Sequence, residues 1–281
     1  TLTDITVFIA VFDGNATGMD ILFCVFGALL FLYTQKNIGH RALKKRYAEL
    51  NTETAETLVQ SPETAQALGQ SDPGAAALAR YVQRSGCYPV YDHTAVTYFP
   101  LGEDKFREML IQLEQAKRFI FLEYFIMAEG EIWDRLSDIL CRKSRQGVEV
   151  KLIFDDFGSM MRMPNEKIDA LQDAGVEVRV FNPVHHYVNR LYFNYRDHRK
   201  ITCVDGDIAY TGGANIADEY ANLIERFGYW KDCGVRLEGE GAWGLTREFL
   251  QMWQRMDGQL YHEYDYYRPL HHPLEQGFCQ T

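Results

Sequence analysis

The sequence predicts an α/β protein whose mixed, largely parallel sheet is covered by helices on both faces. Apolar runs rich in β-branched and aromatic residues at 118–127, 148–156 and 176–183 are typical of strands. Stretches with helical spacing of apolar residues precede and separate them, at 103–117, 129–147 and 164–175. Strands that alternate with helices of this length predict βαβ units, which bury a parallel sheet between two helical layers.

Composition excludes several classes of protein. A chain of 281 residues can bury one substantial core. Its 29 Lys and Arg against 39 Asp and Glu give a net charge of -10, which repels polyanions and argues against a general nucleic-acid binder. The six cysteines form no CxxC pair, so the pattern indicates neither a zinc site nor a disulfide framework. We expect reduced thiols in a cytosolic compartment.

Residues 1–46 are predicted to be the remnant of an apolar membrane anchor and a basic juxtamembrane segment. The apolar run at 21–33 is shorter than the about 20 residues that span a bilayer, and a polar break at 13–20 precedes it. Basic residues between 36 and 46 follow the run, which places the downstream chain on the cytoplasmic side. A buried helix is the alternative, whereas a signal peptide fits poorly because its basic residues precede the apolar run.

The rest of the chain divides into three parts. Residues 47–89 are rich in Ala, Glu, Gln and Thr, and the breaks at Ser61-Pro62 and Asp72-Pro73 predict a linker of short helices. Residues 90–260 form the predicted α/β domain, and residues 261–281 are predicted to be a linker to a second domain that is missing here. Both ends of the chain look cut, so we expect a piece of a longer protein.

The segment 197–204, DHRKITCV, has the alternation of a strand. Side chains two positions apart share a face of a strand, so His198 and Lys200 are predicted to point the same way, with Thr202 behind them. Asp205-Gly206 is a strong hairpin signal that returns the chain along 207–211. An imidazole and an ammonium group therefore lie side by side near one end of the strand.

Further groups are predicted to converge on the same place. Gly212 and Gly213 lack a Cβ, so their backbone amides can approach an anion, and Asn215 adds a side-chain donor. A helix expected at 216–226 would direct its positive N-terminus there. Taken together, these groups suit an anion such as phosphate. Taken singly, each has an ordinary explanation: a structural histidine, a turn, or glycines that only permit tight packing.

The spacing HRKITCVD matches HxKxxxxD and resembles the signature of the phospholipase D superfamily. Four more stretches narrow the resemblance to the first catalytic half of bacterial cardiolipin synthases: FLEYFIM, GVEVKLIFDDFGSM, FGYWKD and VRLEGEGAWGLTREFLQMW. This resemblance implies a phospholipase D-like α-β-α sandwich over residues 90–260 that is preceded by a membrane-associated segment. The likeness extends over nearly the whole chain.

The resemblance also implies a reaction. Two phosphatidylglycerol molecules condense to cardiolipin and glycerol through a phosphohistidine, with no metal or other cofactor. The implied catalytic positions are His198, as nucleophile or as general acid and base, Lys200 and Asp205. The implied phosphate ligands are Lys200 and Asn215, beside the amides of Gly212 and Gly213. The hairpin signal instead places Asp205 in a structural turn at the far end of the strand.

An imidazole that works in catalysis needs a partner to fix its tautomer. Asp232 and Glu225 are the candidates, and an ordinary surface acid is the alternative for Asp232. The pairs His185-His186 and His271-His272 lack a further ligand at metal-binding spacing, so no metal site is expected.

Only one HxKxxxxD motif occurs in this chain, so it is expected to hold one of two half-sites. The second half would come from the rest of a longer chain or from a second copy. The alternatives are a homodimeric single-motif phosphodiesterase or phospholipase, and an inert half that only binds anionic lipid. The expected partners are phosphatidylglycerol and membrane lipid, without nucleic acid, at a bacterial cell membrane with the catalytic domain in the cytoplasm.

Overall fold

The computed structural model describes residues 18–34, 48, 52, 54–184, 195–274 and 277–281, in two compact units. The first, Thr1–Ala48 with His185–Asn194, contributes helix α2 (Gly18–Thr34), which has 17 residues. Among the described residues, no helix combines the length and hydrophobicity needed to cross a membrane. The predicted basic segment at 36–46 and the pair His185-His186 lie outside the described residues.

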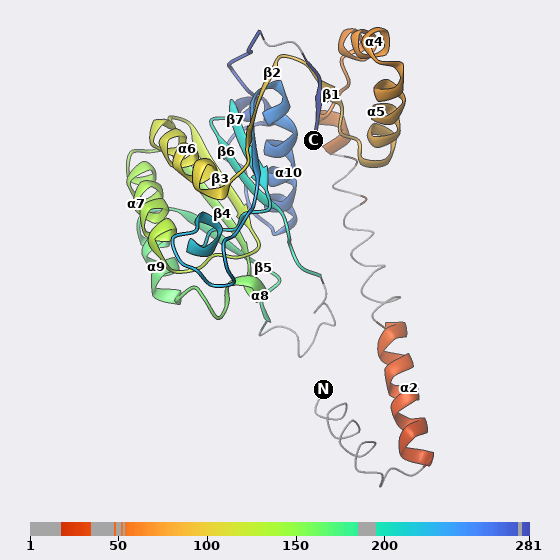
Figure 1. Ribbon diagram of the computed structural model, residues 1–281, viewed down its shortest axis with the longest axis vertical. Coiled ribbons are helices and arrows are strands. Elements are labelled where there is room, and N and C mark those ends of the chain that lie inside the picture. Colours follow the sequence, from red (N-terminus) through yellow and green to blue (C-terminus); the bar gives the residue numbers. More distant parts are fainter. Residues whose placement is uncertain (1–17, 35–47, 49–51, 53, 185–194, 275–276) are drawn as a thin grey trace. The chain divides into compact units, whose positions relative to one another are not determined.

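The second unit, Glu49–Val184 with Tyr195–Thr281, is built on a seven-stranded sheet in the order β2-β8-β7-β6-β3-β4-β5 (Figure 1). The strands are β2 (Thr94–Phe99), β3 (Phe119–Tyr124), β4 (Glu149–Asp155), β5 (Glu177–Phe181), β6 (Lys200–Val204), β7 (Ile208–Gly212) and β8 (Gly234–Gly239).

The prediction of a largely parallel sheet is wrong, because most neighbouring strands pair in antiparallel orientation. Only β3-β4 and β4-β5 pair in parallel, whereas β2-β8, β8-β7, β7-β6 and β6-β3 are antiparallel. The βαβ units therefore extend only over the strands that helices separate. Beyond them, the Asp205-Gly206 turn produces an antiparallel hairpin, as its residues predict.

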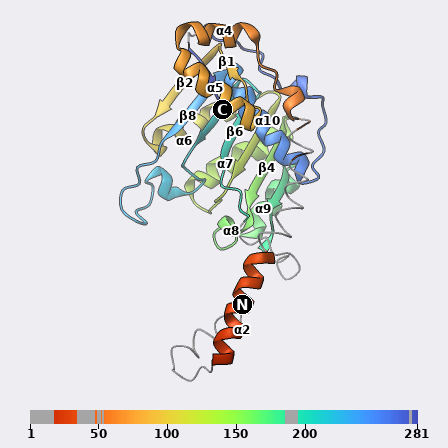
Figure 2. The ribbon, with the colours of Figure 1, turned by 90° about the vertical axis from the view of Figure 1, so that its right-hand side faces the viewer.

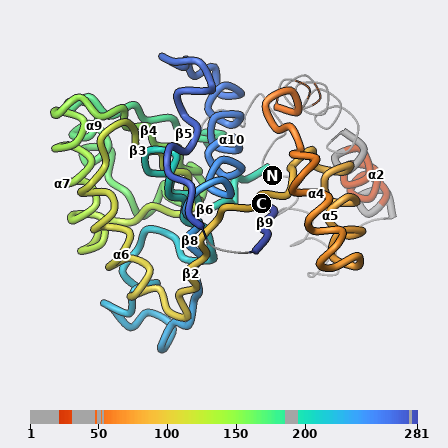
Figure 3. Tube along the Cα trace, turned by 90° about the horizontal axis from the view of Figure 1, so that it is seen from above, coloured from red at the N-terminus to blue at the C-terminus, as the bar shows by residue number. Residues whose placement is uncertain are grey.

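Helices cover both faces of this sheet, as predicted. One face packs against α6 (Gly102–Gln115), α7 (Glu131–Arg145) and α9 (Asn165–Asp173), and the other against α10 (Glu240–Arg255). Figure 3 shows the three layers from above. Along β3, Ile120 and Leu122 enter the first core, whereas Phe119 and Phe121 enter the second. The period of two of a strand thus supplies both cores of an α-β-α sandwich.

Local signals explain the best-predicted helix, α7. Apolar side chains at Ile132, Leu136 and Leu140 form its buried stripe. Both oxygens of Asp218 accept hydrogen bonds from its first backbone amides, at 2.9 Å each, so a residue distant in sequence caps its N-terminus. The chain leaves the helix at Gly147, whose φ of +89° lies in the left-handed region.

The expected helix at 216–226 does not form. The structure has a single 3₁₀ turn, η3 (Asp218–Ala221), after which Asn222 adopts a φ of +51°. The side chain of Asn222 also binds the backbone of Trp230. Its Oδ1 accepts from the Trp230 amide at 2.7 Å, and its Nδ2 donates to the Trp230 carbonyl at 2.9 Å. Asp218 and Asn222 therefore use their side chains in tertiary contacts that replace the helix.

Smaller elements complete the unit. The predicted helical linker forms α4 (Pro62–Ser71) and α5 (Pro73–Gly86), and Ser61 and Asp72 cap them. These helices lie at the opposite end of the unit from α8 (Asp156–Ser159) (Figure 2). The remaining elements are β1 (Val90–Tyr91), which pairs with β9 (Cys279–Gln280), and η4 (Tyr264–Tyr267).

Candidate functional site

The chemistry-bearing residues gather where the carboxyl ends of β3 and β4 meet the amino end of β6. His198 and Lys200 lie on the same side of this edge, as predicted. The Nζ atom of Lys200 donates to Nδ1 of His198 at 3.1 Å and to the His198 carbonyl at 2.5 Å. The ring of Phe125 packs on the imidazole with 4.2 Å between centroids. This contact with Nδ1 leaves Nε2 of His198 as the nitrogen available to a substrate.

The surroundings of His198 favour a neutral imidazole. Partial burial lowers the pKa of His198, and the ammonium of Lys200 lowers it further, whereas the carboxylates of Asp155 and Asp197 act in the opposite direction. The net pKa lies below the usual value of 6.5. Most of the His198 population is therefore uncharged at neutral pH, in the form that a nucleophile or a general base requires.

Replacing Lys200 with methionine is expected to raise the pKa of His198. The change removes the positive charge that contacts the imidazole and retains most of the side-chain volume. The titration of the His198 ring signals by NMR, assigned with His198→Asn, measures this pKa. The matched control is Lys117→Met, an exposed lysine at the opposite edge of the sheet, which should leave the titration unchanged. Equal pKa values in wild type and Lys200→Met would contradict the described contact.

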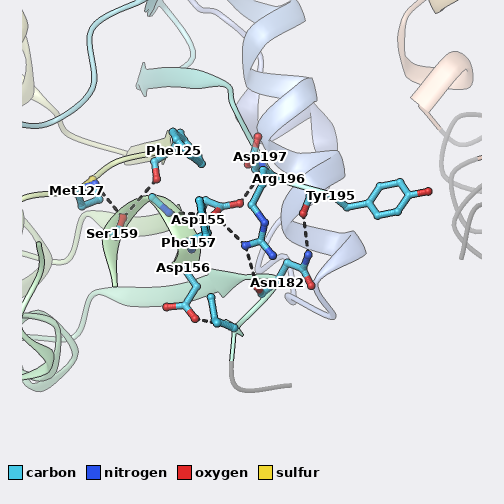
Figure 4. Close-up of polar contacts among 12 residues, drawn as sticks. Phe125, Met127, Asp155, Asp156, Phe157, Ser159, Asn182, Tyr195, Arg196 and Asp197 are labelled. Carbon is cyan, nitrogen blue, oxygen red and sulfur yellow. Dashed lines mark hydrogen bonds and ion pairs between the residues drawn. The ribbon is translucent and has the colours of Figure 1, made fainter. Parts of the chain in front are cut away.

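Asp155 holds the segment that leads into His198 (Figure 4). Its Oδ2 accepts from the backbone amide of Asp197 at 2.9 Å, and its Oδ1 accepts from Nη1 of Arg196 at 3.1 Å. Oδ1 also accepts from the amide of Phe157 at 2.9 Å, which caps α8. Because Asp155 is fully buried, burial raises its pKa above the usual value, and the hydrogen bonds and Arg196 oppose that rise. The carboxylate of Asp155 therefore connects the end of β4 to the segment that leads into β6.

Two polar side chains fix the segment just after β3, which carries Phe125. Ser159 accepts from the amide of Met127 at 2.9 Å, and Asn215 accepts from the amide of Ile126 at 3.0 Å through its Oδ1. The Nδ2 atom of Asn215 donates to the hydroxyl of Tyr220 at 3.0 Å. Asn215 is buried, so its described contacts position the backbone beside His198. Its predicted role as a phosphate ligand stays a prediction.

Arg199 points to the other face of the sheet, where it joins three carboxylates. Its guanidinium lies 2.5 Å from Glu123, 3.4 Å from Asp197 and 3.2 Å from Glu248 of α10. Burial raises the pKa of Glu123 well above its usual range, and Arg199 opposes that rise. Because side chains alternate between the two faces of a strand, His198 and Lys200 lie at the site. Arg199, between them, lies on the opposite face, in a network of ion pairs.

Gly212 and Gly213 permit close packing of the backbone. The sequence analysis gave this as the alternative to an anion-binding role. A Cβ at Gly213 would lie 2.3 Å from Oδ1 of Asp232, and one at Gly212 would lie 2.4 Å from the Cys233 carbonyl. The carboxylate of Asp232 therefore lies against the backbone of Gly213, and the role of the two glycine amides as phosphate ligands stays a prediction. Asp232 also acts on Lys200. Burial lowers the pKa of Lys200, whereas the carboxylates of Asp197 and Asp232 stabilise its positive charge.

Two predicted site residues lie elsewhere, one at the far end of β6 and the other on an exposed loop. Asp205 sits at the far end of β6, where its carboxylate accepts from the backbone amides of Lys117, Arg118 and Phe119 at 2.7 to 3.0 Å. These bonds give it the structural role that the hairpin argument predicted. Glu225 lies on the exposed loop after η3. The carboxylates that influence the pKa of His198 are Asp155 and Asp197.

Sequence reasoning missed Lys105 of α6, which is fully buried near Asp232 and Lys200. One signal was available: Lys105 stands four residues before Met109, on the buried stripe of the helix. Asp155 and Asp156 end the strand predicted at 148–156, where they could face the site, cap a helix or be solvated, and Arg199 was not singled out. Their roles depend on partners far away in the sequence.

Comparisons with known proteins agree on one family. Residues 109–238 match the family described as "Cardiolipin synthase, PLD-like domain". An uncharacterized protein of Streptococcus mutans serotype c is 43% identical over 231 residues, which cover 82% of this chain and 50% of that protein. A cardiolipin synthase of Geobacillus kaustophilus is 33% identical over 248 residues, which cover 88% of this chain and 49% of that protein. One of Oceanobacillus iheyensis is 39% identical over 178 residues, which cover 63% and 36%.

This chain thus spans about half, or less, of the length of these curated relatives. The match covers the whole site edge from β3 to β8, including the HxKxxxxD segment at 198–205. The chain therefore belongs to the phospholipase D superfamily, and residues 109–238 form a domain of its cardiolipin synthase type.

Proposed function

We propose that this chain supplies one half-site of a phosphatidyltransferase that condenses two phosphatidylglycerol molecules to cardiolipin and glycerol. The observation that carries the proposal is the contact between Lys200 and His198 at an exposed sheet edge, with Nε2 of a largely neutral imidazole left available. Relatives named cardiolipin synthase support the choice of reaction.

The proposed transfer has two steps. In the first, an imidazole nitrogen attacks the phosphorus of phosphatidylglycerol, the bond from phosphorus to the glycerol oxygen breaks, and a second imidazolium gives its proton to the departing alkoxide. In the second step, the imidazole that gave up its proton takes the proton of an acceptor hydroxyl. The oxygen of this hydroxyl attacks phosphorus, and the phosphorus-nitrogen bond breaks. His198 is one of the two histidines. Lys200 stabilises the charge that develops on the phosphoryl oxygens.

The second histidine must come from another half-site, because the sequence contains one HxKxxxxD motif. The relatives are at least about twice as long as the aligned region, so a second half in a longer chain is the favoured source. A second copy of this chain is the other source. With water as acceptor, the same chemistry would release phosphatidic acid, which is the phospholipase alternative.

The proposal includes lipid partners and a place in the cell. Apolar side chains of α2, among them Leu22, Phe23 and Phe26, are more than half exposed, which supports association with a membrane. The net charge of -10 disfavours nucleic acid as a substrate. We therefore propose that the catalytic unit acts at a bacterial membrane, and the basic residues that follow the apolar run favour its cytoplasmic side.

The test is phosphatidyl transfer on phosphatidylglycerol vesicles by the purified chain, alone and with a separately expressed second half of a cardiolipin synthase relative. Lipid products are identified by mass spectrometry, and light scattering gives the oligomeric state. Cardiolipin and glycerol formed only with the second half support a half-site, and the same products from a homodimer support the paired form. Phosphatidic acid as the main product, or no product in either mixture, would overturn the proposal.

A further inference from the structure

Lys105 is a buried cation that no described hydrogen bond satisfies. Its side chain is fully buried, and its Nζ has no hydrogen-bond partner in the described part of the chain. The rings of Phe106 and Tyr124 lie 5.4 and 5.7 Å from the Nζ atom. Gly234 admits the aliphatic stem, because a Cβ there would lie 2.7 Å from Cδ of Lys105. An enclosed ammonium without a partner is unfavourable and rare, so its presence calls for an explanation.

The charged and titratable groups that act on Lys105 lie beside the proposed phosphate site. Asp232 and Cys233 stabilise its positive charge, and Lys200 opposes it. Asp232 also stabilises the charge of Lys200. Its carboxylate lies against Gly213, within 2.3 to 2.9 Å of where a Cβ would be. One carboxylate therefore acts electrostatically on two lysines, with no ion pair to either of them among the described residues, and Lys200 is the lysine that contacts His198.

We propose that Lys105 is a positioning residue whose positive charge offsets that of Asp232 and so leaves Lys200 free to bind the phosphodiester. Without the charge of Lys105, the Asp232 carboxylate would attract Lys200 alone and would compete with the substrate phosphate for it. The inference rests on the proposed function, because it assigns a role within the same phosphate site. Burial lowers the pKa of Lys105 to about 8, so its ammonium form predominates at neutral pH and is lost above that value.

The direction of a stability change separates this role from a structural one. The pKa of Lys105 is lower in the folded protein than the usual 10.5. Its charge therefore destabilises the fold fully below pH 8, and the penalty is relieved as the pH rises from 8 toward 10.5. Lys105→Met should consequently raise the melting temperature at pH 7, and this gain should shrink near pH 10. A structural lysine would show the opposite sign.

The experiment measures binding of glycerophosphoglycerol, the deacylated headgroup, whose single negative charge is constant between pH 6 and 10. Binding to the purified chain is followed by NMR. We expect Lys105→Met to bind about tenfold more weakly at pH 7, despite its higher melting temperature, and Lys105→Arg to retain most of the affinity. Wild-type binding should weaken above pH 8, whereas Lys105→Arg should keep it to higher pH.

Two further variants make the outcomes distinguishable. Lys143 is another buried lysine, and its Nζ donates to the Ala116 carbonyl at 3.0 Å, so Lys143→Met should lower the melting temperature and leave headgroup binding unchanged. Lys200→Met should abolish binding. If the wild type does not bind, or if Lys200→Met binds equally well, the proposed phosphate site is wrong. If binding depends on Lys200 but not on Lys105, only the role of Lys105 is overturned.

Discussion

Replacing His198 with alanine is expected to lower the rate of phosphatidyl transfer by about 10⁴-fold or more, which corresponds to about 5.5 kcal/mol of activation free energy. The variant loses one of the two proposed imidazoles, so the reaction lacks either its nucleophile or the group that transfers the proton. Initial rates of cardiolipin formation, measured with the second half present, test this expectation.

The fold of the His198→Ala variant should be preserved. The imidazole is exposed, and its principal packing partner is Phe125. The matched control is His271→Ala, whose side chain is 62% exposed and lies outside the site edge. It should keep wild-type activity. A His198→Ala protein that is folded and retains more than about a tenth of the activity would remove His198 from the mechanism.

Replacing Arg199 with methionine should cause the largest loss of stability among substitutions near the site. The change leaves Glu123, Asp197 and Glu248 without the guanidinium that they share. Removing one partner of a buried ion pair typically costs about 3 to 5 kcal/mol, because a charge is left uncompensated. We expect a loss of about that size in the free energy of unfolding at pH 7, measured by urea denaturation.

A second substitution provides the internal control for Arg199. Because burial raises the pKa of Glu123, its acidic proton is retained to higher pH than usual, and Glu123→Gln should be much less damaging alone. In the double variant, the loss should be smaller than the sum of the two single losses, since one stranded carboxylate has been removed. Strictly additive losses would mean that Arg199 and Glu123 do not interact.

The sequence predicted those parts of the fold that local signals determine. The period of two placed His198 beside Lys200, and the Asp205-Gly206 pair predicted the hairpin that follows. Helical spacing located α6, α7 and α9. The family was also recognised from its motifs, which the match over residues 109–238 confirms.

Features that depend on distant partners were beyond such reasoning. The antiparallel pairing of β3 with β6 joins segments about eighty residues apart, and no local pattern specifies it. The predicted helix at 216–226 failed because Asp218 caps α7 and Asn222 binds the backbone of Trp230. Lys105 resembles an ordinary helical lysine until folding brings it near Asp232.

The stereochemical course at phosphorus tests the central claim, a two-step transfer through histidine, most directly. Phosphatidylglycerol made chiral at phosphorus with oxygen isotopes is turned over by the assembled enzyme, and the configuration of the product is determined by NMR. Each displacement inverts phosphorus, so two successive displacements predict overall retention, which should disappear together with activity in His198→Ala. Overall inversion would show a single direct displacement and would contradict the account.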